Sequence, residues 1–288
     1  MARSTIAATR TAHDAARMGR NAATSPWSIG LARFGYAAKG VVYLIIGGLA
    51  AKAAVGAGGT TTDRNGALRA LYEQPFGKFL LAIVAVGLIA YALWSIVRAI
   101  VDPEGTGSDG KGIATRLGYT AVGLSYAALS AAAIQLVMGT GNGGKSSDAT
   151  TQDWTAHLLT LPFGPFLVVM VGLVVIGVAC YVFRKAYKAD FQHELDLAAV
   201  SARIRKVTIN VGRFGYAALG VVFTIVGIFL VVAAARHRAG QAKGLGGALA
   251  ELAHQPYGHV LLAVVALGLV AYGAYSFVQA RYRRFSAA

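Results

Sequence analysis

The chain has 288 residues, of which 56% are hydrophobic and 14% are charged, and its formal net charge at pH 7 is +15. Six continuous apolar stretches each approach the roughly 20 helical residues that cross a bilayer core of about 30 Å. This composition excludes an ordinary soluble domain, and the length of the stretches excludes a β-barrel, whose membrane strands have about 10 residues of alternating polarity. Because no nucleic-acid-binding motif accompanies the positive charge, we expect no nucleic acid as a partner.

The first predicted element is a basic cytoplasmic segment over residues 1–30. It contains Arg10, Arg17 and Arg20 but no apolar core, so it is not a secretory signal. Its basic and small apolar residues are typical of a segment that lies on a membrane surface. We therefore expect it to precede the membrane helices without crossing the bilayer.

Three repeats follow, predicted over residues 31–104, 114–192 and 210–284. Each opens with an arginine, a bulky apolar residue, a glycine and a tyrosine, and each has a later Pro-aromatic-Gly step that leads into a second apolar run. Such self-similarity indicates a repeated structural unit, and an apolar segment in lipid must be helical to satisfy its backbone hydrogen bonds. The membrane helices are predicted near residues 37–55, 79–100, 117–138, 165–183, 214–235 and 259–279.

The predicted fold class is an all-α membrane protein with six transmembrane helices. Since every repeat crosses the membrane twice, all three repeats enter from the same side and can be related by an axis along the membrane normal. We therefore expect three parallel two-helix repeats around a pseudo-threefold axis. Short amphipathic helices near residues 66–72 and 247–253 are expected to lie flat at the outer interface.

Small and aromatic residues recur along one face of the first helix of each repeat. Their steps of three and four residues are those of neighbours on a helix surface. Small residues let membrane helices approach closely, and aromatic rings fill the adjacent grooves. We interpret this face as a helix-packing stripe rather than a ligand site. The stripe consists of Tyr36, Gly40, Tyr43 and Gly47 in the first repeat, Tyr119, Gly123 and Tyr126 in the second, and Tyr216, Gly220, Phe223 and Gly227 in the third.

Arg33, Arg116 and Arg213 stand at the N-terminal end of the first helix of each repeat. A cation there opposes the positive end of the helix dipole, at a cost of about 0.3–1 kcal/mol. Our hypothesis is that anionic lipid headgroups meet these side chains, because a guanidinium can bond two phosphate oxygens at once. The alternative is that the three arginines are plain topology anchors or bond carbonyls of a neighbouring helix.

The distribution of Lys and Arg predicts the orientation in the membrane. The N-terminal segment, the loops between repeats and the C-terminal tail hold 18 of the 27, and the loops within repeats hold 8. The positive-inside rule then places both termini and both inter-repeat loops in the cytoplasm. In the second of these loops, charges alternate with apolar residues and predict an amphipathic linker helix over 193–209. This helix is a candidate contact for a protein partner, and a solvated face without a partner is the alternative.

The six predicted helices contain no Asp or Glu, which argues against an ion-coupled transporter or an enzyme within the membrane. Lys39 lies one turn from its predicted helix end and is expected to reach the interface. Cys180 is expected to be a buried structural thiol. His254 and His259 are separated by Pro256, which is poor geometry for a metal site. We expect no catalytic residue, no metal and no cofactor.

The Arg-aromatic-Gly-Tyr opening, the Gln-Pro-aromatic-Gly steps at 74–77 and 255–258 and the segment 188–191 resemble an uncharacterised bacterial membrane family, domain of unknown function 1206. The resemblance covers residues 31–283 and implies six membrane helices in a bacterial inner membrane. It implies no activity, cofactor or catalytic residue. The second repeat departs from the pattern, with Leu117 in place of the aromatic residue and Leu161 in place of the glutamine.

Two functions lead, and the third class is a membrane enzyme whose acids and bases would have to come from poorly repeated loop residues. The first is a non-enzymatic membrane protein that contacts lipid or a membrane partner. The alternative is a pore or carrier for a small uncharged solute along the pseudo-threefold axis. An axis closed by Tyr, Leu and Ile side chains favours the first function, and an open, wet axis favours the second.

Overall fold

The computed structural model describes residues 25–103, 105–107, 109–141, 144–198 and 200–284. Most of the predicted basic segment, residues 1–24, lies outside these residues. The described chain is helical, and its backbone pairing outside helices includes one isolated bridge between Leu195 and Arg283. Six helices are long and apolar enough to cross a membrane, which confirms the prediction of a multi-pass all-α protein. They are α2 (Pro26–Ala54), α4 (Gly77–Val101), α5 (Gly110–Met138), α7 (Gly164–Lys188), α8 (Ala202–Ala235) and α10 (Gly258–Tyr282).

The first helix of each repeat begins well before its apolar run. Ser25 caps α2 by accepting a hydrogen bond from the Ser28 amide, and Asp109 caps α5 in the same way through Gly112. A capping side chain satisfies an amide that the helix leaves unpaired, so the helix starts at the cap rather than at the first apolar residue. The predicted boundary at residue 30 is therefore wrong, because residues 26–30 belong to α2.

The predicted linker helix over 193–209 is also wrong. A 3-10 helix, η1 (Asp190–Glu194), is followed by the extended residue Leu195, which forms the bridge with Arg283, and α8 begins only at Ala202. The extended part pairs with the end of α10, where the Asp196 amide donates to the Tyr282 carbonyl at 2.7 Å. These backbone hydrogen bonds hold the segment against the bundle in a conformation that its charge pattern does not indicate.

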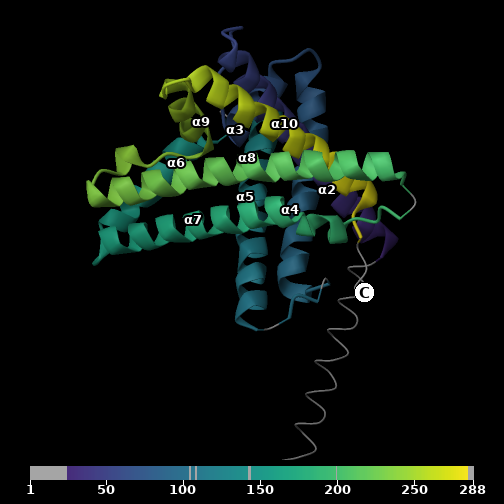
Figure 1. Cartoon of the computed structure of the whole chain (residues 1–288). Helices are drawn as coiled ribbons and strands as arrows, with labels where there is room; N and C mark the ends of the chain where they lie inside the picture. Colours follow the sequence, from purple (N-terminus) through teal and green to yellow (C-terminus); the bar gives the residue numbers. More distant parts are fainter. Residues whose placement is uncertain (1–24, 104, 108, 142–143, 199, 285–288) are drawn as a thin grey trace, which may run out of the picture.

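The long helices pack mostly between repeats (Figure 1). The closest pairs are α4 with α5, α7 with α8, and α10 with α2, while α2 with α4 and α8 with α10 also pack within their repeats. In the second repeat, α5 and α7 make at most marginal contact, and α7 and α8 run crosswise to α4 and α5 in this view. The six long helices therefore form a ring in which five neighbouring pairs are packed together. The sixth pair, α5 and α7, is not packed, and we call it the open junction. Three repeats are present, but the full pseudo-threefold arrangement is not confirmed.

Glycines that correspond between the repeats locate the open junction. A Cβ placed on Gly35 would lie 2.6 Å from the Tyr91 backbone nitrogen, and one on Gly215 would lie 2.7 Å from that of Tyr272. A Cβ on Gly118, the equivalent residue of the second repeat, would meet nothing within 4 Å. The first and third repeats therefore pack their own two long helices together at this glycine, and the second repeat does not.

Helix α7 lacks the residues that make this contact elsewhere. Val178 stands where α4 and α10 have a tyrosine, and Val174 stands where they have a glycine. Val174 is 62% exposed and Val178 is 44% exposed. Without the glycine the backbones cannot approach closely, which accounts for the separation of α5 and α7.

Three short helices meet at one end of the bundle: α3 (Arg64–Tyr72), α6 (Ser147–Leu159) and α9 (Leu245–His254). Asp63 caps α3 through the Gly66 amide and also accepts from the first amide of α6. Asp148 of α6 in turn accepts from the amides of Gly244 and Gly247 at the start of α9, at 2.5 and 3.0 Å. We call this the short-helix end. The opposite end, with the loops between repeats and η1, is the inter-repeat end.

Candidate functional site

Two of the three repeated arginines bond the ends of neighbouring helices. Arg116 donates from Nε to the Ala99 carbonyl at 2.7 Å and from Nη2 to the Ile100 carbonyl at 3.1 Å, both in the last turn of α4. Arg213 donates from Nη2 to the Tyr187 carbonyl of α7 at 3.3 Å. The carbonyl end of a helix carries a partial negative charge. It therefore compensates the arginine at the start of the adjacent antiparallel helix.

Arg33 occupies the corresponding position on α2 and is exposed. Arg213 is also exposed, and only its Nη2 bonds the described chain. Arg116 is half-buried and uses two of its nitrogens. The side chains of Arg33 and Arg213 are therefore more exposed to a headgroup than that of Arg116.

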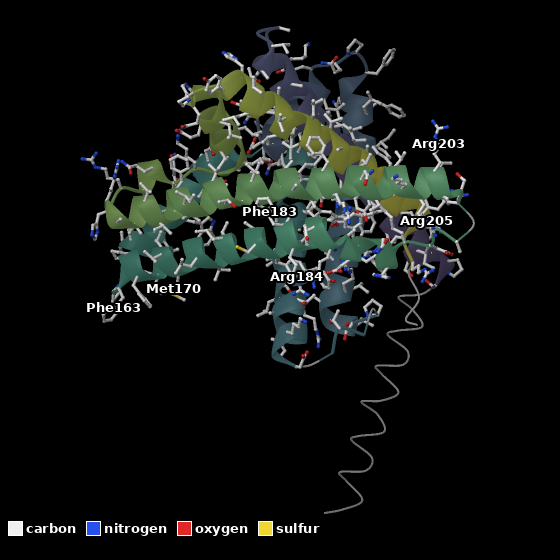
Figure 2. The ribbon with its side chains drawn as sticks, viewed as in Figure 1. Phe163, Met170, Phe183, Arg184, Arg203 and Arg205 are labelled. Atoms are coloured by element: carbon white, nitrogen blue, oxygen red, sulfur yellow. The ribbon has the colours of Figure 1, made fainter. Side chains whose placement is uncertain are left out.

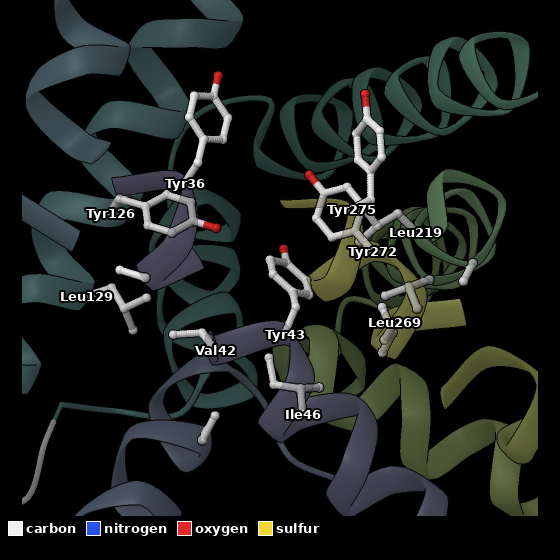
Figure 3. Close-up of a cluster of buried hydrophobic side chains, with 14 of the residues drawn as sticks. Tyr36, Val42, Tyr43, Ile46, Tyr126, Leu129, Leu219, Leu269, Tyr272 and Tyr275 are labelled. Atoms are coloured by element: carbon white, nitrogen blue, oxygen red, sulfur yellow. The ribbon is translucent and has the colours of Figure 1, made fainter. Parts of the chain in front are cut away.

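Tyrosine rings connect five of the long helices through the centre of the bundle, and Figure 3 shows those of α2, α5 and α10. The pairs Tyr126–Tyr91 and Tyr91–Tyr36 have ring centroids 4.6 and 5.1 Å apart and link α5, α4 and α2. The pairs Tyr43–Tyr272 and Tyr272–Tyr216 are 4.8 and 5.4 Å apart and link α2, α10 and α8. All these contacts are edge-on, which is a favourable geometry for aromatic pairs.

These rings and the apolar residues between them fill the centre. Tyr36 is 1% exposed, and Ile46 and Leu269 are fully buried in the same cluster. Tyr119 and Phe223, the remaining aromatic residues of the predicted stripe, are less deeply buried. Tyr119 accepts a hydrogen bond from Nη2 of Arg98 at 2.5 Å and lies over that guanidinium.

The glycines of the stripe lie against neighbouring helices. A Cβ on Gly40 would lie 2.9 Å from the Gly273 carbonyl oxygen, and one on Gly47 would lie 2.8 Å from that of Ala266, both on α10. The other three glycines, Gly123, Gly220 and Gly227, face the side chains of Ile96, Phe183 and Ile176 at 2.6 to 2.8 Å. The geometry is that of close helix packing, and it contains no space for a ligand at these positions.

Lys39 does not reach the membrane interface, so the expectation for this residue was wrong. Its side chain is 3% exposed and lies in the centre of the bundle, where Nζ donates to the Tyr272 hydroxyl at 3.1 Å. The rings of Tyr36, Tyr91 and Tyr272 surround Nζ at 5.1, 5.2 and 4.8 Å from their centroids. Such rings attract a cation through their negative faces.

An ion cluster lies beside Lys39 and its three tyrosines, at the inter-repeat end. Glu194 of η1 accepts from Lys185 of α7 at 2.5 Å and from Arg283, after α10, at 2.8 Å. Burial alone would raise the pKa of the Glu194 carboxyl, but Arg283, Lys185 and Arg98 together hold this pKa well below its usual range. Glu194 therefore remains ionised at neutral pH and ties the second inter-repeat segment to two helices.

Further polar groups lie between Lys39 with its tyrosines and the short-helix end. The Tyr126 hydroxyl interacts with both Tyr43 and the Arg64 guanidinium. Arg64 stands over the Tyr126 ring at 5.6 Å and donates to the Ser125 hydroxyl at 2.8 Å. The hydroxyls of Tyr36 and Tyr275 are buried and have no hydrogen-bond partner in the described part of the chain.

The sequence contains one local signal for the position of Lys39. This residue follows Tyr36 by three residues and precedes Tyr43 by four, so it belongs to the same helix face as the stripe. No comparable signal marks Glu194 or Arg283, which lie outside the helices and meet across 89 residues of sequence.

Cys180 is exposed on α7, so the expectation of a buried thiol was wrong. Helix α7 packs mainly on α8, which leaves most of its circumference uncovered. Cavities of about 280 and 180 Å³ lie at the short-helix end, the larger beside Arg69 and Tyr72 and the smaller beside Asp63 and Asp148. Within the described ranges, no group of three His, Cys, Asp or Glu side chains is placed to hold a metal ion.

Comparison with known proteins follows the three repeats. The family described as Domain of Unknown Function (DUF1206) matches residues 34–102, 117–189 and 214–283. The chain is 36% identical to the "Uncharacterized protein YxxB" of Bacillus subtilis (strain 168) over 263 residues, which are 91% of this chain and 94% of that protein. No solved structure matches the chain significantly. Neither description names an activity.

Proposed function

We propose that this chain, which belongs to the family described as Domain of Unknown Function (DUF1206) with all three repeats matched, is a non-enzymatic protein of the bacterial inner membrane that binds anionic phospholipid. In this proposal the inter-repeat end and both termini face the cytoplasm, in the orientation that the positive-inside rule predicts. The lipid headgroups lie against the exposed arginines of that end.

The observation that carries this proposal is the position of those arginines. Arg184 near the end of α7 and Arg203 and Arg205 in the first turn of α8 are exposed at the inter-repeat end (Figure 2). Arg213, farther along α8, is also exposed. Each basic residue near an anionic membrane surface contributes about 1 kcal/mol of attraction. The first turns of α8 also expose Ile204, at 56%, so this helix presents both charge and apolar surface to a membrane.

The filled centre of the bundle favours this function over the pore or carrier. Tyr43 is 8% exposed, Tyr126 is 4% exposed, and Val42 and Leu129 pack beside them (Figure 3). A solute path along the axis requires these side chains to move. A carrier for an uncharged solute therefore remains the second candidate, and it predicts solute flux in reconstituted liposomes.

A protein partner is a further part of the proposal, at residues 193–209. Asp196 and Arg203 of this segment are exposed, although Phe191 just before it is fully buried. Residues 194–196 of the segment are fixed by backbone pairing with the end of α10. The segment therefore presents a partly pre-ordered mixed-charge surface that crosslinking in intact cells can examine.

The test compares anionic with zwitterionic lipid. The wild type and the triple variant Arg203→Gln, Arg205→Gln and Arg213→Gln are placed in phosphatidylglycerol or phosphatidylcholine nanodiscs and melted. We expect phosphatidylglycerol to raise the melting temperature of the wild type and to co-purify with it, and the triple variant to lose most of both effects. The matched control is Arg236→Gln with Arg238→Gln, two exposed arginines beyond the end of α8 at the short-helix end. Equal lipid effects in all three proteins would refute the proposal.

A further inference from the structure

Lys39 has a position that lipid binding does not explain. It lies near the middle of the 29-residue helix α2, which crosses the membrane, and is almost completely buried. Its one hydrogen bond is to the Tyr272 hydroxyl, and no carboxylate of the described chain lies within ion-pair distance of Nζ. Ionisable residues at membrane depth are costly and mark functional sites.

We propose that the Lys39 amine is a proton-binding site inside the membrane span. A neutral amine has a lone pair that can accept a hydrogen bond from the Tyr272 hydroxyl. When a proton binds to this lone pair, Nζ becomes an ammonium and donates to the same hydroxyl oxygen, which changes from donor to acceptor. One proton enters and one positive charge is gained, with no other bond broken. The site needs no cavity, in agreement with the close packing around Lys39.

The surroundings suit both forms of the amine. The three tyrosine rings around Nζ stabilise the ammonium by about 0.5–2 kcal/mol each, while burial without a carboxylate partner penalises it. These opposing effects leave the two forms closer in free energy than they are for an amine in water. The site can therefore change its protonation without a change of fold.

Charged and titratable groups face Lys39 from every element packed around it. The rings of Tyr36, Tyr91 and Tyr272 surround Nζ. The charges that act on it are those of Arg98 on α4, Lys185 on α7, Glu194 and Arg283. The positive charges of Arg283, Lys185 and Arg98 oppose a further charge on Lys39. Because the pKa of the Glu194 carboxyl is lowered, that carboxylate stays ionised and does not compete for the proton.

Tyrosine side chains lie between Lys39 and the short-helix end and line the route that we assign to the proton. Tyr272 meets Tyr43 edge-on, the Tyr43 and Tyr126 hydroxyls interact, and Tyr126 reaches Arg64 beside the outer loops. Each hydroxyl can accept one proton and release its own towards the next hydroxyl or water, while Arg64 keeps its protons and only lines the exit. Bulk water at the short-helix end is then both the source and the acceptor of the proton.

The test is ¹⁵N NMR of the lysine side chains in the full chain, in nanodiscs, between pH 5 and pH 10. The Lys39 signal is assigned by its loss in Lys39→Arg, which keeps a charged group. We expect the Lys39 nitrogen to change from ammonium to amine within this range, and the signals of the exposed Lys188 and Lys206 in the same spectra serve as the comparison. A Lys39 nitrogen that keeps one form from pH 5 to pH 10 would overturn the proposal.

A second measurement examines the hydroxyl path through the rate of hydrogen exchange at Lys39. In Tyr126→Phe the ring stays and the hydroxyl is removed, so we expect hydrogen exchange at the Lys39 nitrogen to slow at least about tenfold with the midpoint of its change retained. The control is Tyr187→Phe, because Tyr187 is 84% exposed and lies off the path. Equal exchange rates in both variants would show that protons reach Lys39 by another route, which overturns the path from the short-helix end.

Discussion

The glycines that correspond between repeats permit a direct test of the open junction. We expect Gly35→Ala and Gly215→Ala to destabilise the protein, and Gly118→Ala to leave it unchanged or slightly more stable. The added methyl groups of the first two would lie 2.6 to 2.7 Å from backbone atoms of Tyr91 and Tyr272, which cannot rotate away. The methyl group at Gly118 would meet nothing within 4 Å.

The magnitude follows from two opposing effects. Replacing glycine by alanine inside a helix stabilises it by roughly 0.5–1 kcal/mol, because glycine loses more backbone freedom on folding. Inserting a methyl group into a tightly packed contact costs about 1–3 kcal/mol. We therefore expect Gly118→Ala to gain up to about 1 kcal/mol, while Gly35→Ala and Gly215→Ala each lose about 1–2 kcal/mol.

The assay is reversible unfolding in mixed micelles, followed by circular dichroism as the fraction of denaturing detergent rises. The three variants differ by one methyl group at equivalent positions, so each serves as a control for the others. If Gly118→Ala lost as much stability as Gly35→Ala, α5 and α7 would have to be packed together in the membrane, and the open junction would be refuted. If Gly35→Ala were neutral, the close approach of α2 and α4 would be wrong.

Three other outcomes follow from particular contacts. Asp148→Ala should destabilise by about 0.5–2 kcal/mol, as loss of a helix cap does, because two amides at the start of α9 lose their acceptor; an unchanged unfolding curve would contradict this role. Because the pKa of the Glu194 carboxyl is lowered, its ion pairs stabilise the fold above pH 4.5, and this stabilisation is lost as the pH falls below that value. Glu194→Gln should therefore make the loss of stability between pH 5 and pH 3 less steep. An equally steep loss in the variant would count against the ion cluster. In a Cys180→Ser background, Ser146→Cys should react with an impermeant thiol reagent from outside intact cells, and reaction only after permeabilisation would reverse the proposed orientation.

Much of the fold was predictable because it depends on short stretches of chain. The six membrane helices follow from the length of the apolar runs, and the stripe from Tyr36 to Gly47 follows from steps of three and four residues. The short helices α3 and α9 were predictable in the same way, since two leucines three residues apart on a polar background are a local pattern. Hydropathy does not mark the early starts of α2 and α5, because these are set by the polar caps Ser25 and Asp109.

The candidate site was only partly predictable, because its groups come from distant parts of the chain. Lys39 and Tyr272 are separated by 233 residues, and their hydrogen bond depends on the packing of α2 against α10. Hydropathy places a lysine near a helix end at the interface, but the side chain of Lys39 lies on the face that α10 covers. The partners of Arg116 were similarly hidden, because they are backbone carbonyls of α4 that no side-chain pattern marks.

The sequence by itself determined the number of membrane helices, their repetition and the faces that pack. Each of these follows from the polarity and spacing of residues within one helix, which neighbouring helices do not alter. Only the tertiary structure decided that α5 and α7 separate, that the 193–209 segment is not a helix of its own, and that Lys39 lies among tyrosines. Each of these depends on which helix surfaces pack against each other, and the sequence of one helix does not show that. Val174 and Val178 remove a contact that the other two repeats make, and the end of α10 supplies a strand-like partner for the segment after η1.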